Sequence, residues 1–476
     1  MGAAAALQPA IPLLRMEEPA PEGVVEVARY KAGFDQARTE EDLKQLFKDN
    51  LDADMAGFRR RAWSIKELAE FVLRFDHTVP RHEQGEGNAA LVILRNGTAK
   101  VQWLRGKDNH WRMACIQAAI NGAKSLRFPD SAFIVNIDDF PVCVLGRCPL
   151  PVFTMYKKWD AKRGGNFETN EVLMPVFNHH YEDLYSFPWD RKRSKAFMRA
   201  SQQGCMVPNS TRAVLAVLSE DHPDRLDLGI TRIDGAQKHD LKHRFSKAGF
   251  VTIEDHAKWK YQVSADGCVA QSRLAKVLLS NSVVLKEESA WIEYYYRSLR
   301  PWKHYVPLPE GDGSARVILS LVDQLRGDDR RAQHLAESAQ KWAYRFLPNY
   351  PRLLYFRKTL VEYNALFGGA MEHWVKEFGP EALFPSNGKL DQGSGGPPPD
   401  ALLSEAEREH VRLQQERYRR RRRRQMTRAA VEALAEEAKL AEQQRQFAAA
   451  IAASAAAPGG KHWWLRQLRK LGPGRL

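Results

Sequence analysis

The chain has 476 residues, a formal net charge of +14 and a hydrophobic share of 44%. This length exceeds what one hydrophobic core usually organises, so we expect two domains and some unpacked extension. No stretch approaches the roughly 20 consecutive apolar residues that cross a bilayer, and the first residues lack the basic and apolar regions of a signal peptide. We therefore expect neither a transmembrane helix nor a signal peptide.

In chain order, short β-rich runs alternate with helical ones up to about residue 346, which predicts an α/β fold. The dipeptide Asn96-Gly97 is typical of a type I′ turn and predicts a hairpin over Leu91–Leu104. Further strands are expected at residues 133–138, 152–156, 196–200, 226–232, 260–266 and 282–286. Helices are expected at residues 114–122, 211–219, 271–281, 290–299 and 314–346.

Two interruptions divide this pattern into domains. The charged segment Phe187–Lys195 separates two α/β halves, and the Gly/Pro/Ser-rich segment Ser386–Asp400 is typical of a flexible linker. Because ligands of open α/β sheets bind beyond the carboxyl ends of the strands, a cleft between the two halves is the expected site. The expected parts are an N-terminal extension (1–50), a first α/β domain (51–190), a second α/β domain (191–380), a linker (381–400) and a helical tail (401–476).

The tail concentrates the positive charge. Residues 401–476 hold 17 basic and 8 acidic side chains, a net charge of +9, which leaves +5 of the total for the first 400 residues. The apolar positions of the tail are too sparse for a core-facing stripe, which favours a solvated helix. The run Arg419–Arg424 leaves open binding to an acidic surface, anionic lipid or nucleic acid, but no base-reading module accompanies it, so nucleic acid is the least favoured partner.

The cysteines and histidines give no metal pattern. The five cysteines form no CxxC pair and no zinc spacing, so we interpret them as structural thiols, with a Cys143–Cys148 pair possible in an oxidising compartment. His179, His180 and His304 are interpreted as structural histidines. The Asp-x-Asp triplet at Asp52–Asp54 is interpreted as a chance match, since no donor-site pattern surrounds it.

The most informative stretch is Lys258–Ser282. A predicted strand ends at Asp266-Gly267, and after a small-residue turn a predicted helix has Ser272 and Arg273 in its first turns. Free backbone N–H groups at a helix start, a hydroxyl and a guanidinium together suit a diphosphate. Many strand–turn–helix units bind nothing, so this pattern alone leaves a structural interpretation open.

A longer series of features gives a family resemblance. The series consists of a lysine- and aromatic-rich strand at 258–264, the Gly267 turn, Ser272-Arg273, Trp291 with Glu293, Pro301-Trp302, His304-Tyr305 and Pro307. It resembles the core of the Rumi-type protein O-glucosyltransferases and fungal capsule-associated proteins of glycosyltransferase family 90. The segments VNIDDFP (135–141) and PWDRKRSKAFMRAS (188–201) extend the resemblance, which runs from about Phe58 to Phe346.

The resemblance implies a GT-B-like fold of two Rossmann-like domains, with the first domain on the acceptor side and the second binding the nucleotide-sugar. It implies an inverting enzyme that transfers glucose or xylose from a UDP-sugar to a hydroxyl of a protein or glycan, with no cofactor and no essential metal. Asp139 matches the general base, and its neighbour Asp138 is expected to face the opposite way. The donor-binding residues that the resemblance implies are Arg199, Ser201, Arg212, Val251, Gly267, Cys268, Val269, Ala270, Gln271, Ser272 and Arg273.

The sequence leaves alternatives for the aromatic residues and for the activity. Aromatic residues at Trp259, Trp291, Tyr294–Tyr296 and Trp302 suit sugar stacking, but their spacing fits core packing, which we expect for most of them. A catalytically idle family member, or a polyanion-binding protein that acts through its basic tail, is the alternative to an enzyme. The family works in the lumen of the endoplasmic reticulum or Golgi, although the sequence shows no targeting segment.

Overall fold

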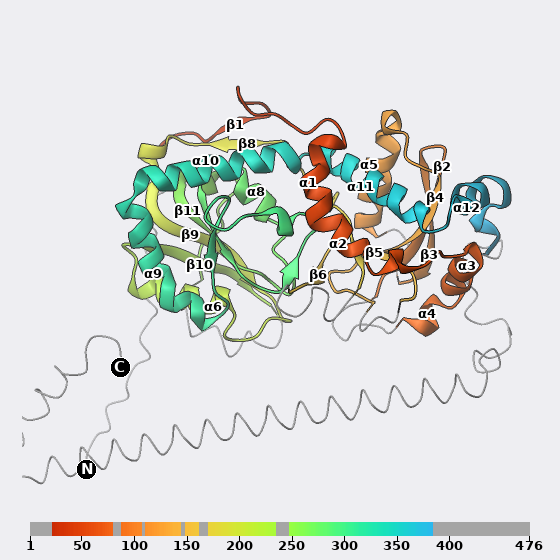
Figure 1. Ribbon diagram of the computed structural model, residues 1–476. Coiled ribbons are helices and arrows are strands. Elements are labelled where there is room, and N and C mark those ends of the chain that lie inside the picture. The colour runs from red at the N-terminus through yellow and green to blue at the C-terminus, as the bar shows by residue number, and fades with distance from the viewer. Residues whose placement is uncertain are drawn as a thin grey trace, which may run out of the picture. The chain divides into compact units, whose positions relative to one another are not determined.

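The computed structural model describes residues 21–79, 87–106, 110–143, 148–160, 170–234 and 247–383 (Figure 1). All of them fall in one compact unit, residues 1–392. The linker Ser386–Asp400 and the arginine run Arg419–Arg424 lie outside the described residues. Within the described part of the chain, no helix is long and apolar enough to cross a membrane.

The first sheet has the strand order β3-β2-β4-β5-β7. Its strands are β2 (Ala89–Arg95), β3 (Thr98–Arg105), β4 (Ser131–Asn136), β5 (Val152–Thr154) and β7 (Val172–Leu173). The predicted hairpin is confirmed: β2 and β3 pair antiparallel, and Asn96 and Gly97 have φ values of 50° and 69° at the turn. β4, β5 and β7 are parallel to one another, so the sheet is mixed.

The second sheet has the order β10-β9-β11-β12-β14, and all its strands are parallel. Its strands are β9 (Arg193–Gln202), β10 (Leu226–Ile233), β11 (Trp259–Ser264), β12 (Val283–Glu287) and β14 (Val306–Leu308). The chain runs from β9 outward to β10 and then returns to the other side of β9 for β11. The strand order therefore reverses between β9 and β11, which is the point where doubly wound sheets bind their ligands.

Helices cover both sheets. The longer ones are α3 (Ile65–Leu73), α5 (Trp111–Gly122), α6 (Thr211–Asp221), α9 (Asp312–Gly327), α10 (Asp329–Phe346) and α11 (Asn349–Ala365). The short helices are α1 (Lys44–Leu46), α2 (Asp52–Met55), α4 (Phe75–Thr78), α8 (Leu274–Leu278) and α12 (Ala370–His373). Two further pairs of short strands lie outside the main sheets. They are β1 (Glu26–Ala28) with β8 (Leu184–Ser186), and β6 (Lys157–Lys158) with β13 (Trp291–Ile292). In Figure 1, α6 and α9 lie together beside the second sheet, and α10 leads from it to α11 beside the first sheet.

Three predicted helices need correction. The helix predicted over 314–346 is two helices, because Gly327 ends α9 and the Asp328 side chain accepts a hydrogen bond from the backbone of Arg331 to begin α10. The helix predicted over 271–281 is only α8. The helix predicted over 290–299 is absent: β13 and a 3-10 turn (Tyr296–Ser298) occupy the segment, where consecutive tyrosines are all buried rather than spaced along one helical face.

The chain crosses back from the second half to the first. Phe356 of α11 packs against Phe133 of β4 and Phe153 of β5, with ring centroids 5.8 and 6.3 Å apart. Tyr363 of the same helix packs against Phe153 at 5.4 Å. β9, the first strand of the second sheet, begins within the segment Phe187–Lys195, and α11 belongs with the first sheet although it follows the second in sequence. The exact domain limits stay a prediction.

Burial settles the roles of most aromatic residues. Trp259 and Tyr294–Tyr296 are buried, so the prediction that they are core residues is confirmed. Trp291 is partly buried against the core. Trp302 is 39% exposed and is the exception to the expectation that most of these aromatic residues belong to the core.

The cysteine prediction also needs correction, because disulfides join Cys143 to Cys148 and Cys205 to Cys268. The possible Cys143–Cys148 pair is confirmed. Cys205 and Cys268 were not predicted to pair, because they are 63 positions apart in the sequence and only the sheet topology brings their Cα atoms to 5.6 Å. Cys115 has a free thiol.

A buried ion cluster joins three distant segments of the chain. The carboxylate of Asp54 on α2 accepts hydrogen bonds from Nζ of Lys157 at 2.5 Å, Nη2 of Arg297 at 2.7 Å and the backbone N–H of Leu173 at 2.9 Å. Burial by itself would raise the pKa of Asp54, but Arg297 and Lys157 outweigh it and hold that pKa below its usual value. Asp54 therefore has a structural role, as expected for a chance Asp-x-Asp match.

Asp54→Asn is expected to lower the free energy of unfolding by about 3–5 kcal/mol, because it leaves two cations buried without their carboxylate. Urea denaturation followed by circular dichroism measures the change. The matched control is Asp52→Asn, two residues away, whose side chain is 51% exposed and pairs with Arg59. A surface pair contributes roughly 0–1 kcal/mol, so equal losses in the two variants would contradict the structural role of Asp54.

Candidate active site

A cavity of about 560 Å³ opens between the two sheets. The first half contributes Trp111, Arg112, Asp139, Tyr156, Asn178 and His179 to its wall. Every site residue that the sequence predicted lines this one cavity: Asp139, Arg199, Ser201, Arg212, Val251, Gly267, Cys268, Val269, Ala270, Gln271, Ser272 and Arg273. The tertiary structure therefore brings the predicted residues together, although they are spread over more than 130 positions of the sequence.

Arg212 on α6 contacts the ends of both β9 and β11, the two strands between which the strand order reverses. From α6, its Nη1 donates to the carbonyl of Ser201 at 2.7 Å, and its Nε and Nη2 donate to the carbonyl of Ala265 at 3.1 and 3.0 Å. Burial, followed by the charge of the nearby Arg273, lowers the pKa of Arg212 to about 10, so it stays protonated at neutral pH. The hydrogen bonds of Arg212 therefore go to backbone carbonyls. Its guanidinium also contributes positive charge to the cavity wall.

Arg199 and Arg273 form the rest of the basic wall. Arg199 forms an ion pair with Asp227 at 2.8 Å, as an ordinary structural arginine does, while also lining the cavity. Arg273 donates from Nη2 to the carbonyl of Arg199 at 2.9 Å. Among the described residues no carboxylate pairs with Arg273, so its charge is available to an anion in the cavity.

The predicted helix start at the donor loop needs correction. The helix α8 begins at Leu274, has five residues and is preceded by Arg273 at its N-cap. So short a helix provides little of the dipole that was expected to bind a diphosphate. The positive charge of this loop comes from the guanidinium groups instead.

Two carboxylates, the partly buried Asp266 and the buried Glu287, fix the backbone of this loop. Asp266 accepts a hydrogen bond from the backbone of Gln271 at 2.8 Å, and Glu287 accepts one from the backbone of Asp266 at 2.6 Å and one from the hydroxyl of Thr211 at 2.5 Å. Burial and the neighbouring Asp266 raise the pKa of Glu287 to about 7. A Cβ at Gly267 would lie 2.4 Å from Oε1 of Gln203, so a side chain there would require the Gln203 amide to move. Sequence analysis missed Glu287, since a lone glutamate at a strand end gives no signal.

On the first half, Asp139 faces the cavity and Asp138 does not, as predicted. Arg112 holds the Asp139 segment through two hydrogen bonds, from Nη2 to the Asp139 carboxylate at 2.7 Å and from Nη1 to the carbonyl of Ile137 at 2.9 Å. Asp138 is buried and accepts hydrogen bonds from the backbone and side chain of Asn88 at 2.9 and 2.7 Å. The side chain of Asp139 is 38% exposed, so it is accessible to a ligand.

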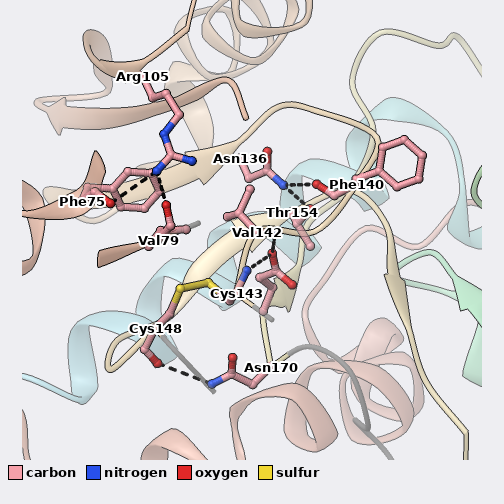
Figure 2. Close-up of a disulfide and its surroundings, with 11 residues drawn as sticks. Phe75, Val79, Arg105, Asn136, Phe140, Val142, Cys143, Cys148, Thr154 and Asn170 are labelled. Carbon is pink, nitrogen blue, oxygen red and sulfur yellow. Dashed lines mark hydrogen bonds between the residues drawn. A yellow bond between two sulfur atoms is a disulfide. The ribbon is translucent and has the colours of Figure 1, made fainter. Parts of the chain in front are cut away.

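The loop that follows Asp139 is fixed by one side chain close to it in sequence and by one distant side chain. Figure 2 shows the amide of Asn136 directed at the carbonyl of Phe140, to which it donates at 2.8 Å. The carboxylate of Glu171 accepts hydrogen bonds from the backbone N–H groups of Val142 and Cys143, beside the Cys143–Cys148 disulfide. Sequence analysis missed the roles of Asn136 and Glu171, as it missed that of Arg112, because their partners are set by the fold.

The remaining wall of the first half is neutral and partly aromatic. Burial, followed by nearby positive charges such as Lys276, lowers the pKa of His179 to about 4, so this imidazole is uncharged at neutral pH. Trp111 is 55% exposed, and Phe250 of the second half is 83% exposed, and both contribute to the cavity wall. Within the described segments, no three His, Cys, Asp or Glu side chains lie close enough to hold a metal ion.

Comparison with known proteins places the chain in a family. Residues 125–373, half of the chain, match the model of glycosyl transferase family 90. Protein O-glucosyltransferase 3 of Mus musculus is 28% identical over 277 residues, which cover 54% of this chain and 52% of that protein. Protein O-glucosyltransferase 1 of Bos taurus is 26% identical over 262 residues, which cover 50% of this chain and 63% of that protein.

The chain therefore belongs to glycosyltransferase family 90. It spans about half the length of the first relative and less than two thirds of the second. A solved structure of Anabaena Alr3699/HepE in complex with UDP and glucose has a TM-score of 0.29 and 11% identity, covering 48% of this chain and 64% of that one. A TM-score this low does not establish a shared fold, so the α/β architecture rests on the two sheets described above.

Arg273→Ala is expected to weaken the binding of UDP and inorganic pyrophosphate by about tenfold or more, because a charge-assisted contact to phosphate is lost. Isothermal titration calorimetry measures both ligands. The control is Arg61→Ala, which removes an exposed arginine paired with Glu67 outside the cavity. Equal affinities of the Arg273 variant and the parent protein would show that the basic wall does not bind phosphate.

Proposed function

We propose that the chain is an inverting glycosyltransferase that moves glucose or xylose from a UDP-sugar to a hydroxyl of a protein or glycan, with Asp139 as the general base. The observation that carries this proposal is the single cavity in which Asp139 of the first half meets Arg199, Arg212 and Arg273 of the second. Family membership supports the reaction class, and the names of the relatives favour glucose as the sugar.

The second half suits the donor. The leaving UDP gains negative charge on its terminal phosphate as the bond to the anomeric carbon breaks, and preorganised cations lower the free energy of that state. Arg273, which forms no ion pair with a described carboxylate, is the first candidate for this contact, followed by Arg199 and Arg212. The loop residues Gly267–Ser272 then surround the phosphates and the sugar.

The first half suits the acceptor. In an inverting transfer the acceptor oxygen attacks the anomeric carbon from the side opposite the departing phosphate, and its proton passes to a base. Asp139 faces the cavity from the half opposite the arginines, and Arg112 fixes its carboxylate at 2.7 Å. The exposed ring of Trp111 and the neutral side chains of Asn178 and His179 provide a surface on which an uncharged, hydroxyl-bearing acceptor can lie.

The same proposal extends to the location of the protein. We infer that it works in the lumen of the endoplasmic reticulum or Golgi, as the family resemblance implies. Two disulfides within the described residues support an oxidising compartment, since disulfides are rare in the reducing cytosol. Detection of an intact Cys143–Cys148 bond by mass spectrometry of protein from native cells tests this location, and finding only free thiols would contradict it.

Asp139→Asn is expected to lower the rate of sugar transfer by about 10²–10⁴-fold while UDP binds with unchanged affinity, because the amide keeps the shape of the side chain but cannot accept the proton. Transfer from UDP-glucose and UDP-xylose to hydroxyl acceptors is followed by release of UDP, and binding by calorimetry. Unchanged transfer would show that Asp139 is not the base. If the parent protein binds UDP but transfers no sugar to any acceptor, the idle-member alternative is favoured.

Transfer is also expected to continue undiminished after metal ions are removed with EDTA. The reason is that guanidinium groups of the cavity supply the positive charge that metal-dependent enzymes obtain from a bound cation. Initial rates before and after chelation, and after adding Mg²⁺ or Mn²⁺ back, measure the effect. A loss on chelation that Mn²⁺ restores would overturn this part of the proposal.

A further inference from the structure

We propose that Cys205 is a positioning residue for the donor, because its disulfide with Cys268 holds the loop that surrounds the diphosphate. Reduction of this bond is then expected to weaken nucleotide binding. The inference rests on the proposed function, since it takes a uridine nucleotide as the ligand of the cavity. The disulfide is a covalent constraint, so the loop is held in its binding conformation only in the oxidised protein.

The disulfide joins two segments that leave neighbouring strands of the second sheet. Cys205 lies between β9 and α6, in the segment 203–210, and Cys268 lies directly after Gly267 in the loop that follows β11. Cys268 lines the cavity, and so does Gln203 at the start of the other segment. The Cα atoms are 5.6 Å apart, which is the ordinary separation for a disulfide. The bond therefore crosses the point where the strand order reverses.

The other contacts described between these two segments are weaker or lie at their ends. The backbone N–H of Cys268 donates to Oε1 of Gln203 at 3.4 Å, which is long for a hydrogen bond. Arg212 binds the carbonyls of Ser201 and Ala265, both of which precede the segments themselves. Among the contacts described between these two segments, the disulfide is therefore the firmest.

Among the described residues, the strongest polar contacts of the loop lie at its two ends, while Val269 and Ala270 between them are buried. At its start, the backbone of Asp266 donates to Glu287, and at its far end the backbone of Gln271 donates to Asp266. Cys268 lies between these anchors, five positions before Arg273. A loop that is already fixed in its binding conformation loses less conformational entropy when the ligand binds, so cutting the central attachment lowers affinity without removing any group that contacts the ligand.

Reduction of the Cys205–Cys268 bond balances in electrons and protons. A dithiol such as dithiothreitol gives two electrons and two protons, the Cys205–Cys268 bond breaks to two thiols, and the reductant closes to its own cyclic disulfide. The freed Cys268 thiol then faces the cavity. A bound nucleotide is expected to shield it from a thiol reagent, which gives a readout that does not depend on catalysis.

The experiment compares UDP affinity in the full chain for the oxidised parent protein, Cys205→Ser, Cys268→Val and the double variant. We expect each single variant to bind UDP about tenfold more weakly than the parent, and the double variant to be no weaker than either, because one bond is lost in all three. The matched control is Cys143→Ser, which breaks the other disulfide on the Asp139 loop and is expected to leave UDP affinity unchanged.

A second measurement guards against variants that fail to fold. The oxidised parent is titrated with dithiothreitol, and the fraction of reduced Cys268, found by alkylation and mass spectrometry, is compared with UDP affinity and with the circular dichroism spectrum. We expect affinity to fall as Cys268 is reduced while the spectrum is unchanged, UDP to slow the alkylation of Cys268, and reoxidation to restore affinity.

The results of these experiments distinguish a failure of the positioning role from a failure of the donor site itself. If the oxidised parent does not bind UDP, the donor site itself is wrong, and this inference fails with it. If UDP binds the oxidised parent, Cys205→Ser and the reduced parent with the same affinity, the donor site stands and the positioning role is overturned. Reduction of Cys268 that lowers affinity only as the spectrum is lost would overturn it as well, because the bond would then support the fold rather than the loop.

Discussion

The basic wall of the cavity depends on the guanidinium of Arg212. Its bonds to the carbonyls of Ser201 and Ala265 hold together the ends of β9 and β11, the two strands between which the strand order reverses. Parallel strands leave unpaired backbone carbonyls where they end, and here an arginine on the following helix satisfies them. The loops that line the cavity begin at these two points, so their positions follow from this contact.

The two halves of the cavity differ in charge. The second half presents a basic wall, with the charge of Arg273 available to an anion, while the first half presents Asp139 fixed by Arg112 beside neutral groups. This division suits a reaction in which negative charge develops on one side of a sugar ring and a proton leaves from the other. The buried cluster around Asp54 and the return of α11 to the first sheet keep the halves together.

Each half also carries one disulfide close to the cavity. Cys143–Cys148 follows Asp139 in the first half, and Cys205–Cys268 joins the segment after β9 to the loop after β11 in the second. In the chain-entropy view, closing a span of 63 residues stabilises the folded state by about 4 kcal/mol, which is a large share of the stability of an ordinary domain. Both bonds lie in segments that follow sheet strands and border the cavity rather than within the strands.

Local sequence determined several features by itself. Asn96-Gly97 specified its hairpin because the turn needs positive φ at two adjacent positions, and the alternation of strands and helices gave the α/β class. The motifs around Asp139 and Arg273 identified the residues that share the cavity. Tertiary structure alone decided the pairing of Cys205 with Cys268. It also decided the contacts that Arg112 and Glu171 make with the Asp139 loop, and the loss of the helix expected at 290–299. Those features join residues far apart in the chain, and their partners are set by sheet topology and burial, which neighbouring residues do not encode.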